Sequence, residues 1–391
     1  MKNRYDVVVV GGGPAGSMAA KYSANNGASV ALFEKDREIG IPVRCGEAAS
    51  EEGLKQYVDI DNSWVAATIQ DIRFISPSGK IVDLHSPSRG FILHRRLFDH
   101  SLALEASNQG AEIFTKAYVY GLEKTDNRDY NVLVRHIGRN LKVEAGIVIA
   151  ADGVESRVGR FAGLHTQTQI KNFESCAQMT VGNININPTR IDFHFSRRWA
   201  PGGYVWVFPK GDRTANIGLG VNGKYATNRP AIDYLESFIK EKFPDVSQLT
   251  TVAGGVPVDK TISRIYADNF MIVGDAAHQV NPMTGGGILS GMAAGKIAGT
   301  VAAKAIQKNE KSSKFLKEYQ KKWNEKVGKS HERYFRLKEW INDMTDEDLD
   351  QLAEMLQGID SEDITLTKIF KLAVRKKPAL LIDVAKVLAG L

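Results

Sequence analysis

Three glycines near the start of the chain, Gly11, Gly13 and Gly16, have the spacing of a loop that binds a pyrophosphate. Glycine permits a tight turn there and lets backbone N–H groups approach the phosphates, whose charge is favoured at the positive end of a following helix. Glu34 comes about twenty residues later, where a carboxylate can bind a ribose hydroxyl. An acidic residue at this place favours FAD or NAD over a cofactor that carries a 2′-phosphate.

The surrounding sequence predicts the elements that position these residues. Residues 7–10 are apolar and β-branched, as in a strand buried on both faces of a parallel sheet. Pro14 is typical of a first helical turn, residues 15–25 have helix-forming composition, and residues 30–33 are a second apolar run. Because strand, glycines, helix, strand and acid occur in this order, the pattern predicts a dinucleotide-binding unit and not merely a turn.

A second cofactor contact is predicted around Asp275. A buried-strand pattern precedes it, and three glycines at 285–287 lead into a predicted helix over residues 289–306. The Asp275 carboxylate suits a ribityl or ribose hydroxyl, and the positive end of the helix suits the anionic edge of a reduced flavin. Arg95, at the start of another predicted helix, could pair with cofactor phosphates, although the adjacent Arg96 leaves the choice open.

Cys45 lies in a loop rich in proline and glycine that follows a predicted strand end. Two interpretations stay open for it. A free cysteine is usually a small buried side chain. Between Arg44 and Glu47, beside a nucleotide site, the thiol could also touch a flavin or donate a proton.

A β-rich insert is predicted over residues 171–257. Within it Tyr204, Trp206 and Phe208 occupy alternate positions of one run, so their rings should share one face of a sheet. A strongly aromatic face needs an apolar partner. That partner is either a helix of the protein itself or a bulky hydrophobic substrate.

Composition sets the broad class of the protein. With 391 residues and 43% hydrophobic content, the chain can bury a large core and should form two or three domains. The first strand begins almost at once, and no apolar run is long enough to cross a bilayer, so we expect a cytoplasmic or membrane-peripheral protein. The two cysteines, Cys45 and Cys176, form no metal or disulfide pattern, so no metal site is expected.

The positive charge is concentrated in residues 304–339, which hold ten Lys and two Arg against five Glu. The ordinary interpretation is a solvated helical face. The alternative is attraction to anionic lipid headgroups or to an acidic electron donor. Nucleic acid is not expected as a partner, because no recognised nucleic-acid module accompanies the charge.

Several of these motifs together resemble known flavoproteins. The glycine loop with Glu34, the pair Asp152-Gly153 and the pair Gly274-Asp275 resemble the FAD-binding set of para-hydroxybenzoate-hydroxylase-like proteins. Residues 42–47 (PVRCGE) and 204–211 (YVWVFPKG) are similar to the geranylgeranyl reductase family, and within it to the archaeal digeranylgeranylglycerophospholipid reductases. The resemblance covers most of the chain.

The resemblance implies an FAD-dependent enzyme that saturates the double bonds of geranylgeranyl chains in archaeal membrane lipids. It implies these cofactor-binding residues: Gly11, Gly13, Ala15, Gly16, Glu34, Cys45, Gly46, Ala48, Arg95, Val119, Asp152, Asp275, Gly287 and Ile288. Ala48 stands where the family often has glycine, so its contact should be through the backbone. Cys45 is expected nearest the reacting bond, and Tyr204, Trp206 and Phe208 should line a prenyl tunnel.

The expected fold class is α/β. A Rossmann-like FAD-binding domain (1–65, 95–165 and 258–306) should hold an inserted β-sheet substrate domain (66–94 and 166–257), followed by a helical region at 307–391. An external donor such as NAD(P)H or ferredoxin should reduce the flavin. No second strand–glycine–helix unit occurs, so a tightly bound nicotinamide cofactor with its own domain is not expected. The protein should work at the inner face of the cell membrane. The alternatives are an aromatic or quinone monooxygenase and a non-catalytic prenyl-binding protein.

Overall fold

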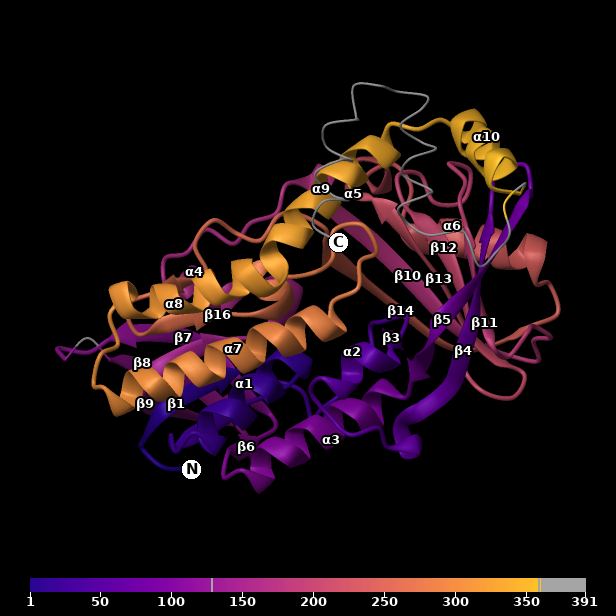
Figure 1. Ribbon diagram of the computed structural model, residues 1–391. Helices are drawn as coiled ribbons and strands as arrows, with labels where there is room; N and C mark the ends of the chain where they lie inside the picture. The colour runs from indigo at the N-terminus through magenta and orange to yellow at the C-terminus, as the bar shows by residue number, and fades with distance from the viewer. Residues whose placement is uncertain (128, 358, 360–391) are drawn as a thin grey trace. The chain divides into compact units, whose positions relative to one another are not determined.

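The computed structural model describes residues 1–127, 129–357 and 359 (Figure 1). The chain forms two compact units. Unit 1 contains Met1–Val43, Arg95–Thr168 and Asp259–Glu332, and unit 2 contains Arg44–His94, Gln169–Val258 and the chain from Arg333 onward. Each unit is built on an eight-stranded sheet. The predicted fold class, a Rossmann-like α/β domain with an inserted β-sheet domain and C-terminal helices, is confirmed.

The division into units differs from the predicted domain boundaries, chiefly in three stretches: residues 44–65, residues 307–332, and the chain from Arg333 onward, which belongs to unit 2. Residues 44–65 lie in unit 2, where β3 (Ala48–Ser50) pairs with β5 (Ile81–Leu93). Residues 307–332 lie in unit 1, where the Tyr319 hydroxyl donates to the Ile272 carbonyl at 3.0 Å. The apolar run at 379–387 and the rest of the predicted helical region beyond residue 359 lie outside the described residues.

The sheet of unit 1 has the order β15-β16-β9-β1-β2-β6. Its strands are Arg4–Val10 (β1), Val30–Phe33 (β2), Glu112–Phe114 (β6), Arg139–Ala150 (β9), Tyr266–Ala267 (β15) and Phe270–Ile272 (β16). β1 is parallel to β2 and β9 and is buried on both faces in its second half, which explains its unbroken run of valines. Two antiparallel strands, β7 (Ala117–Lys124) and β8 (Tyr130–His136), extend β9.

The longer helices of unit 1 are α1 (Pro14–Asn25), α3 (Arg95–Asn108), α7 (Ile288–Gln307) and α8 (Ser313–Trp323). Glycines on α7 allow it to lie very close to α1. A Cβ atom at Gly295 would lie 2.1 Å from the Ala15 carbonyl oxygen, and one at Gly299 would lie 2.4 Å from that of Ala19. Since only glycine fits this approach, the two helices are held with their N-terminal ends side by side.

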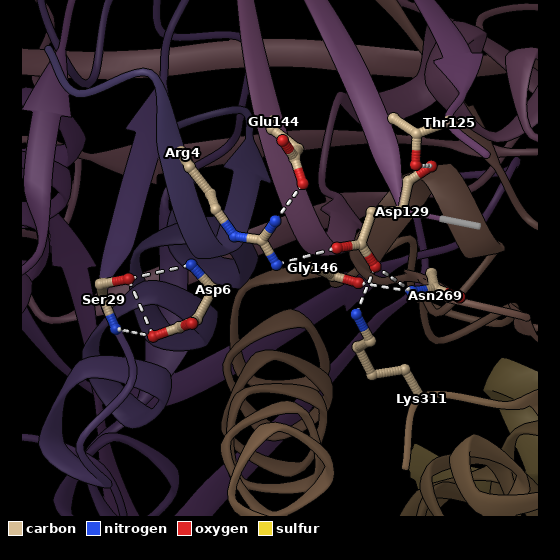
Figure 2. A network of polar contacts seen from close by, with 9 residues as sticks. All are labelled: Arg4, Asp6, Ser29, Thr125, Asp129, Glu144, Gly146, Asn269 and Lys311. Atoms are coloured by element: carbon tan, nitrogen blue, oxygen red, sulfur yellow. Dashed lines mark hydrogen bonds and ion pairs between the residues drawn. The ribbon is translucent and has the colours of Figure 1, made fainter. Parts of the chain in front are cut away.

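A buried carboxylate, Asp129, joins four separate parts of unit 1 (Figure 2). Its Oδ2 accepts from Arg4 of β1 at 3.0 Å, and its Oδ1 accepts from the Asn269 amide at 3.0 Å and pairs with Lys311. Asn269 also donates to the Gly146 carbonyl of β9 at 2.7 Å. We call this group the Asp129 cluster. It ties β1, the turn before β8, the start of β16 and the α7–α8 connection together.

The sheet of unit 2 has the order β14-β10-β13-β12-β11-β4-β5-β3. Its remaining strands are Val65–Ile75 (β4), Phe173–Gly182 (β10), Arg190–His194 (β11), Tyr204–Pro209 (β12), Thr214–Asn222 (β13) and Ser247–Pro257 (β14). Neighbouring strands are antiparallel except β4 and β11, which are parallel.

The two faces of this sheet differ in chemistry because successive residues of each strand point to opposite sides. One face is aliphatic, with Val205, Ile217 and Leu219, and α6 (Ala231–Lys242) packs on it through Leu235 and Phe238. The other, which we call the aromatic face, carries the following side chains: Phe193, Tyr204, Trp206 and Phe208, with the polar side chains of β10.

Two further helices, α9 (Lys329–Asn342) and α10 (Asp346–Gln357), follow α8. α10 packs on β5 through Ala353, Leu356 and Val82, and the Asp350 carboxylate accepts the Ser78 N–H at 2.9 Å. Among the described residues, no helix combines the length and apolarity that crossing a membrane requires. In the same part of the chain, no group of three or more His, Cys, Asp or Glu side chains is placed to hold a metal ion.

Candidate active site

The turn between β1 and α1 requires glycine at two of its three predicted positions. Gly11 has φ +107°, and a Cβ atom on it would lie 2.2 Å from the Ala151 carbonyl oxygen. A Cβ atom on Gly16 would lie 1.9 Å from the Gly11 carbonyl oxygen. Gly13 differs, because no atom lies within 4 Å of its missing Cβ. The turn is therefore tight on its protein side and open at the helix start.

The N-terminus of α1 is available to an anion. Gly13 is the N-cap residue, Pro14 follows at the first helical position, and no side chain caps the helix. Uncapped N–H groups and the helix dipole together form an anion site. This twelve-residue helix, entered through an open glycine, fits a pyrophosphate.

Glu34 directly follows β2 and lies against the glycine turn. Its Oε2 accepts the Gly12 N–H at 2.7 Å, and its Oε1 accepts the Asp36 N–H at 2.9 Å. Each carboxylate oxygen can accept a further hydrogen bond. The side chain is thus fixed by backbone donors and still has capacity for a hydroxyl group.

Asp275 and the start of α7 lie beside the same helix end. A Cβ atom on Gly287, the N-cap of α7, would lie 3.0 Å from Asp275 Oδ1, and one on Gly274 would lie 2.9 Å from the Ala15 side chain. No side chain caps α7, whose first residue, Ile288, is buried. Asp275, Gly287 and Ile288 therefore lie around a second open helix N-terminus, next to Ala15 of α1.

Two effects on the pKa of the Asp275 carboxyl oppose each other. Burial raises the pKa of its carboxyl, and the positive charge of Arg95 acts to lower it. The Arg95 guanidinium binds Asp99 through two hydrogen bonds of 2.7 and 2.8 Å, whereas Arg96 pairs with Glu38 at the surface. Of the two adjacent arginines, Arg95 is therefore the one directed toward the Asp275 region.

Asp152 and Val119 are the two other predicted cofactor contacts of unit 1. The Asp152 Oδ2 accepts the Val158 N–H at 2.9 Å and so caps the short helix α4 (Arg157–Phe161), while its buried Oδ1 has no partner among the described residues. Burial raises the pKa of this carboxyl. Val119 is a buried residue of β7.

In unit 2, the segment with Cys45 and Gly46 lies against the aromatic face. The Gln178 amide donates to the Cys45 carbonyl at 2.9 Å, and the Cys45 thiol accepts the Glu47 N–H at 3.2 Å. A Cβ atom on Gly46 would lie 3.0 Å from the Phe208 ring. Ala48 is exposed at the start of β3, so a contact through its backbone is feasible.

Glu47 anchors this segment. It is 3% exposed, pairs with Lys210, and accepts the Asn216 amide at 2.6 Å. Its φ of +73° places it in the left-handed region, which a non-glycine residue seldom adopts. The buried ion pair thus fixes the strained backbone on which Cys45 and Gly46 are mounted.

The aromatic face holds the three predicted rings in one network. Trp206 donates through Nε1 to Gln178 Oε1 at 3.0 Å and lies over Gly218, where a Cβ atom would be 2.4 Å from its ring. The centroids of Tyr204 and Trp206 are 6.1 Å apart, and those of Trp206 and Phe208 are 6.3 Å apart. Phe208 is buried, whereas Tyr204 and Trp206 are only half-buried.

Sequence reasoning missed the polar residues that support these groups: Glu47, Glu174, Gln178, Lys210 and Asn216. A signal for two of them was present in β10, where Cys176, Gln178 and Thr180 alternate with Ala177, Met179 and Val181, and Glu174 lies on the same side as the polar residues. Such alternation indicates a polar sheet face, which a site can use. Glu47 and its partners are distant in sequence, and no local pattern predicts them.

Comparison with known proteins agrees with this arrangement. Residues 172–256 match the geranylgeranyl reductase catalytic domain, and residues 5–191 match the pyridine nucleotide-disulphide oxidoreductase family. A digeranylgeranylglycerophospholipid reductase of Methanocella arvoryzae is 42% identical over 97% of this chain and 98% of its own. One from Methanosarcina acetivorans is 42% identical over 98% of this chain and 96% of its own.

Solved structures show the same relationship. A geranylgeranyl bacteriochlorophyll reductase-like protein of Thermoplasma acidophilum superimposes with a TM-score of 0.93 at 34% identity, covering 98% of this chain and 99% of that one. A flavin-dependent brominase has a TM-score of 0.69 at 18% identity, covering 96% of this chain and 99% of that one. The second likeness concerns the fold alone.

Proposed function

Because the chain belongs to the digeranylgeranylglycerophospholipid reductase family, we propose that it saturates carbon–carbon double bonds of geranylgeranyl chains during archaeal membrane lipid synthesis. The observation that carries this proposal is the 42% identity over 97% of the chain, which extends through both units. The catalytic-domain match at 172–256 spans nearly all of β10 to β14, the strands that build most of the aromatic face. The protein is an oxidoreductase, and its cofactor is FAD.

The residues of unit 1 fit a flavin dinucleotide. The open turn at Gly11, Gly13 and Gly16, with Ala15, suits the pyrophosphate, and Glu34 suits the adenosine ribose. Asp275 suits the ribityl hydroxyls. The remaining contacts proposed for FAD are Arg95, Val119, Asp152, Gly287 and Ile288 in unit 1, and Cys45, Gly46 and Ala48 in unit 2. The orphaned Oδ1 of Asp152 supports its inclusion.

Reduced FAD supplies the hydride of an alkene reduction. The protein must hold the alkene in place, exclude water and supply one proton. We place Cys45 nearest the reacting bond, because its backbone is fixed by Gln178 on the aromatic face. Tyr204, Trp206 and Phe208 would line the prenyl chain, since their rings form one continuous apolar surface and two of them are only half-buried.

The substrate and the charge of the chain support work at a membrane surface. Part of the basic stretch is neutralised internally, since Lys304 and Lys322 pair with Glu318 and Lys311 pairs with Asp129. Lys308, Lys314 and Lys317 are exposed around the start of α8. We propose that they contact anionic headgroups of the inner face of the cell membrane, and that an external donor such as NAD(P)H or ferredoxin reduces the flavin.

The test uses the purified protein. Its FAD is reduced chemically under anaerobic conditions and mixed with a digeranylgeranylglycerophospholipid in detergent. We expect the oxidised flavin spectrum to return as saturated lipid forms. Return of the spectrum without any saturated product would contradict the proposed function, and a protein purified without flavin would favour a prenyl-binding role.

A further inference from the structure

Glu174 is a buried acid on the aromatic face that the proposed site does not yet use. It lies near the start of β10 and is 9% exposed. Its Oε1 accepts the Asn222 amide at 3.3 Å, whereas its Oε2 is buried and has no hydrogen-bond partner among the described residues. A buried carboxylate oxygen without a partner is costly when it is charged, so this geometry favours the neutral acid.

The free oxygen of Glu174 lies next to the predicted substrate surface. Oε2 is 3.3 Å from the position that a Cβ atom of Gly203 would take, and Gly203 immediately precedes Tyr204. Across the sheet, Tyr204 pairs with Gly220, which pairs with Cys176 of β10. Glu174 Oε2 and Cys176 Sγ both lie within 3.7 Å of the missing Cβ of Gly220.

Burial favours the protonated form of the Glu174 carboxyl. Burial raises its pKa to about 8, although the Asn222 hydrogen bond and the charge of Lys338 on α9 both act to lower it. Lys338 itself donates to the Val258 carbonyl. The other titratable groups that interact electrostatically on this face are the thiols of Cys176 and Cys45 and the hydroxyl of Tyr204, all of which are neutral when protonated.

Glu51 shows that low exposure alone does not produce this state. It is 8% exposed and lies in the same unit, but hydrogen bonds from Lys55 and Arg89 lower the pKa of its carboxyl. Glu174 differs because, in the part of the chain that the structure describes, its Oε2 accepts no hydrogen bond, from a cation or otherwise.

We propose that Glu174 is the acid that donates the proton in the reduction of the alkene. The proposal rests on the proposed function. One alkene carbon accepts a hydride, which carries an electron pair, from the reduced cofactor. The other carbon forms a C–H bond with the proton of Glu174, whose O–H bond breaks, and water later reprotonates the carboxylate.

The first test is single-turnover lipid reduction by the FAD-loaded enzyme at several pH values. Glu174→Gln keeps the shape and removes the proton, so the rate should fall by roughly 100-fold or more, the usual contribution of a general acid. FAD content should stay unchanged. Glu51→Gln is the matched control and should keep the wild-type rate. A Glu174→Gln variant that retains a third or more of the rate overturns the proposal, whereas an inactive wild type overturns the proposed function.

The second test does not depend on activity. Carbon-13 NMR of glutamate-labelled protein should show one carboxyl that titrates near pH 8 in the wild type and is missing in Glu174→Gln. Asn222→Leu should move this titration to higher pH, since it removes a hydrogen bond that stabilises the carboxylate. Titration of Glu174 near its usual range of about 4 overturns the proposal even if Glu174→Gln fails to fold.

The thiol of Cys45 is the competitor to eliminate, because an ordinary cysteine titrates at about 8.5. The rate of the wild type should fall as pH rises through 8. In Cys45→Ser, that fall should persist at the same pH if Glu174 supplies the proton. Loss of the pH dependence in Cys45→Ser, with the dependence retained in Glu174→Asp, assigns the proton to the thiol and overturns the proposal.

Discussion

Asp129 in unit 1 and Glu174 in unit 2 are both almost fully buried carboxyl groups, with opposite surroundings. Both oxygens of Asp129 are bonded, to Arg4, Asn269 and Lys311 (Figure 2). Glu174 has one bond, from Asn222, and an oxygen without a partner. The same chemical group therefore links parts of the fold where cations and amides bind both of its oxygens. Where burial leaves one oxygen without a hydrogen bond, the protonated form is favoured.

The comparison extends to the packing around each acid. In unit 1, polar groups and glycines are used to bring elements together, as in the Asp129 cluster and the contact of α1 with α7. The aromatic face of unit 2 keeps half-buried rings and an orphaned acid next to one another. Buried groups left unsatisfied lower stability and are retained where function requires them.

The largest effect should be in how stability depends on pH. The folded-state pKa of Glu174 is raised from 4.5 to about 8, so between these values the native state holds a proton that the unfolded state has released. Wild-type stability, measured relative to Glu174→Gln, should therefore fall as pH rises from 5 to 8, by about 1.4 kcal/mol per pH unit at most. Urea unfolding at each pH measures it. Parallel curves for the two proteins would show that Glu174 is ordinarily ionised.

Removing the charge of Asp129 should have the next largest effect. Asp129→Asn leaves Lys311 and Arg4 without their shared partner and should lower the free energy of unfolding by about 3 kcal/mol. Glu144→Gln is the control, because it removes only the less buried partner of Arg4 and should change stability by less than about 1 kcal/mol. Equal changes in the free energy of unfolding for the two substitutions would show that the Asp129 cluster does not stabilise unit 1.

The approach of α1 to α7 predicts a smaller loss. Gly295→Ala inserts a methyl group 2.1 Å from the Ala15 carbonyl oxygen, and overpacking of this kind costs about 2 kcal/mol. FAD retention should fall as well, because both open helix ends would shift. Gly291→Ala is the matched control on the same helix. Its added carbon would meet Ala15 at 3.4 Å, an ordinary contact, so stability should be unchanged or slightly higher.

The smallest effect is expected at Glu34. Glu34→Ala removes the carboxylate that we propose binds the adenosine ribose, and should weaken FAD binding about tenfold, or roughly 1.4 kcal/mol. Isothermal titration of the apoprotein with FAD measures this change. Glu38→Ala is the control. Glu38 is also an acid of unit 1, but it pairs with Arg96 at the surface, so this variant should bind FAD like the wild type. An unchanged affinity for FAD in Glu34→Ala would show that Glu34 does not bind the adenosine ribose.

Structural features that depend on residues close together in the chain could be predicted from the sequence. The strand of valines before Gly11, the helix after Pro14 and the place of Glu34 at a strand end all follow from local pattern, and the structure has them. The α/β class and the inserted sheet followed from the same patterns. Alternation along β12 was enough to expect its three rings together.

Contacts between distant residues could not be predicted in this way. Asp129 meets Lys311 across 182 positions of the chain, and Glu47 meets Asn216 across 169. The glycines of α7 were visible, but their use against α1 depends on how two helices pack. Glu174 was part of a visible alternation in β10, yet its state depends on Asn222, Lys338 and burial, which only the folded chain brings together.

Lipid mass spectrometry tests the central claim most directly. A host that makes digeranylgeranylglycerophospholipids but cannot reduce them is given the wild-type protein or the Glu34→Ala variant. The account predicts that, with the wild type, the lipid mass rises by two hydrogen atoms for each double bond of the geranylgeranyl chains that is reduced. With the variant, fewer double bonds should be reduced. Membrane lipids that stay fully unsaturated with an FAD-loaded wild-type protein and a working electron donor would contradict it.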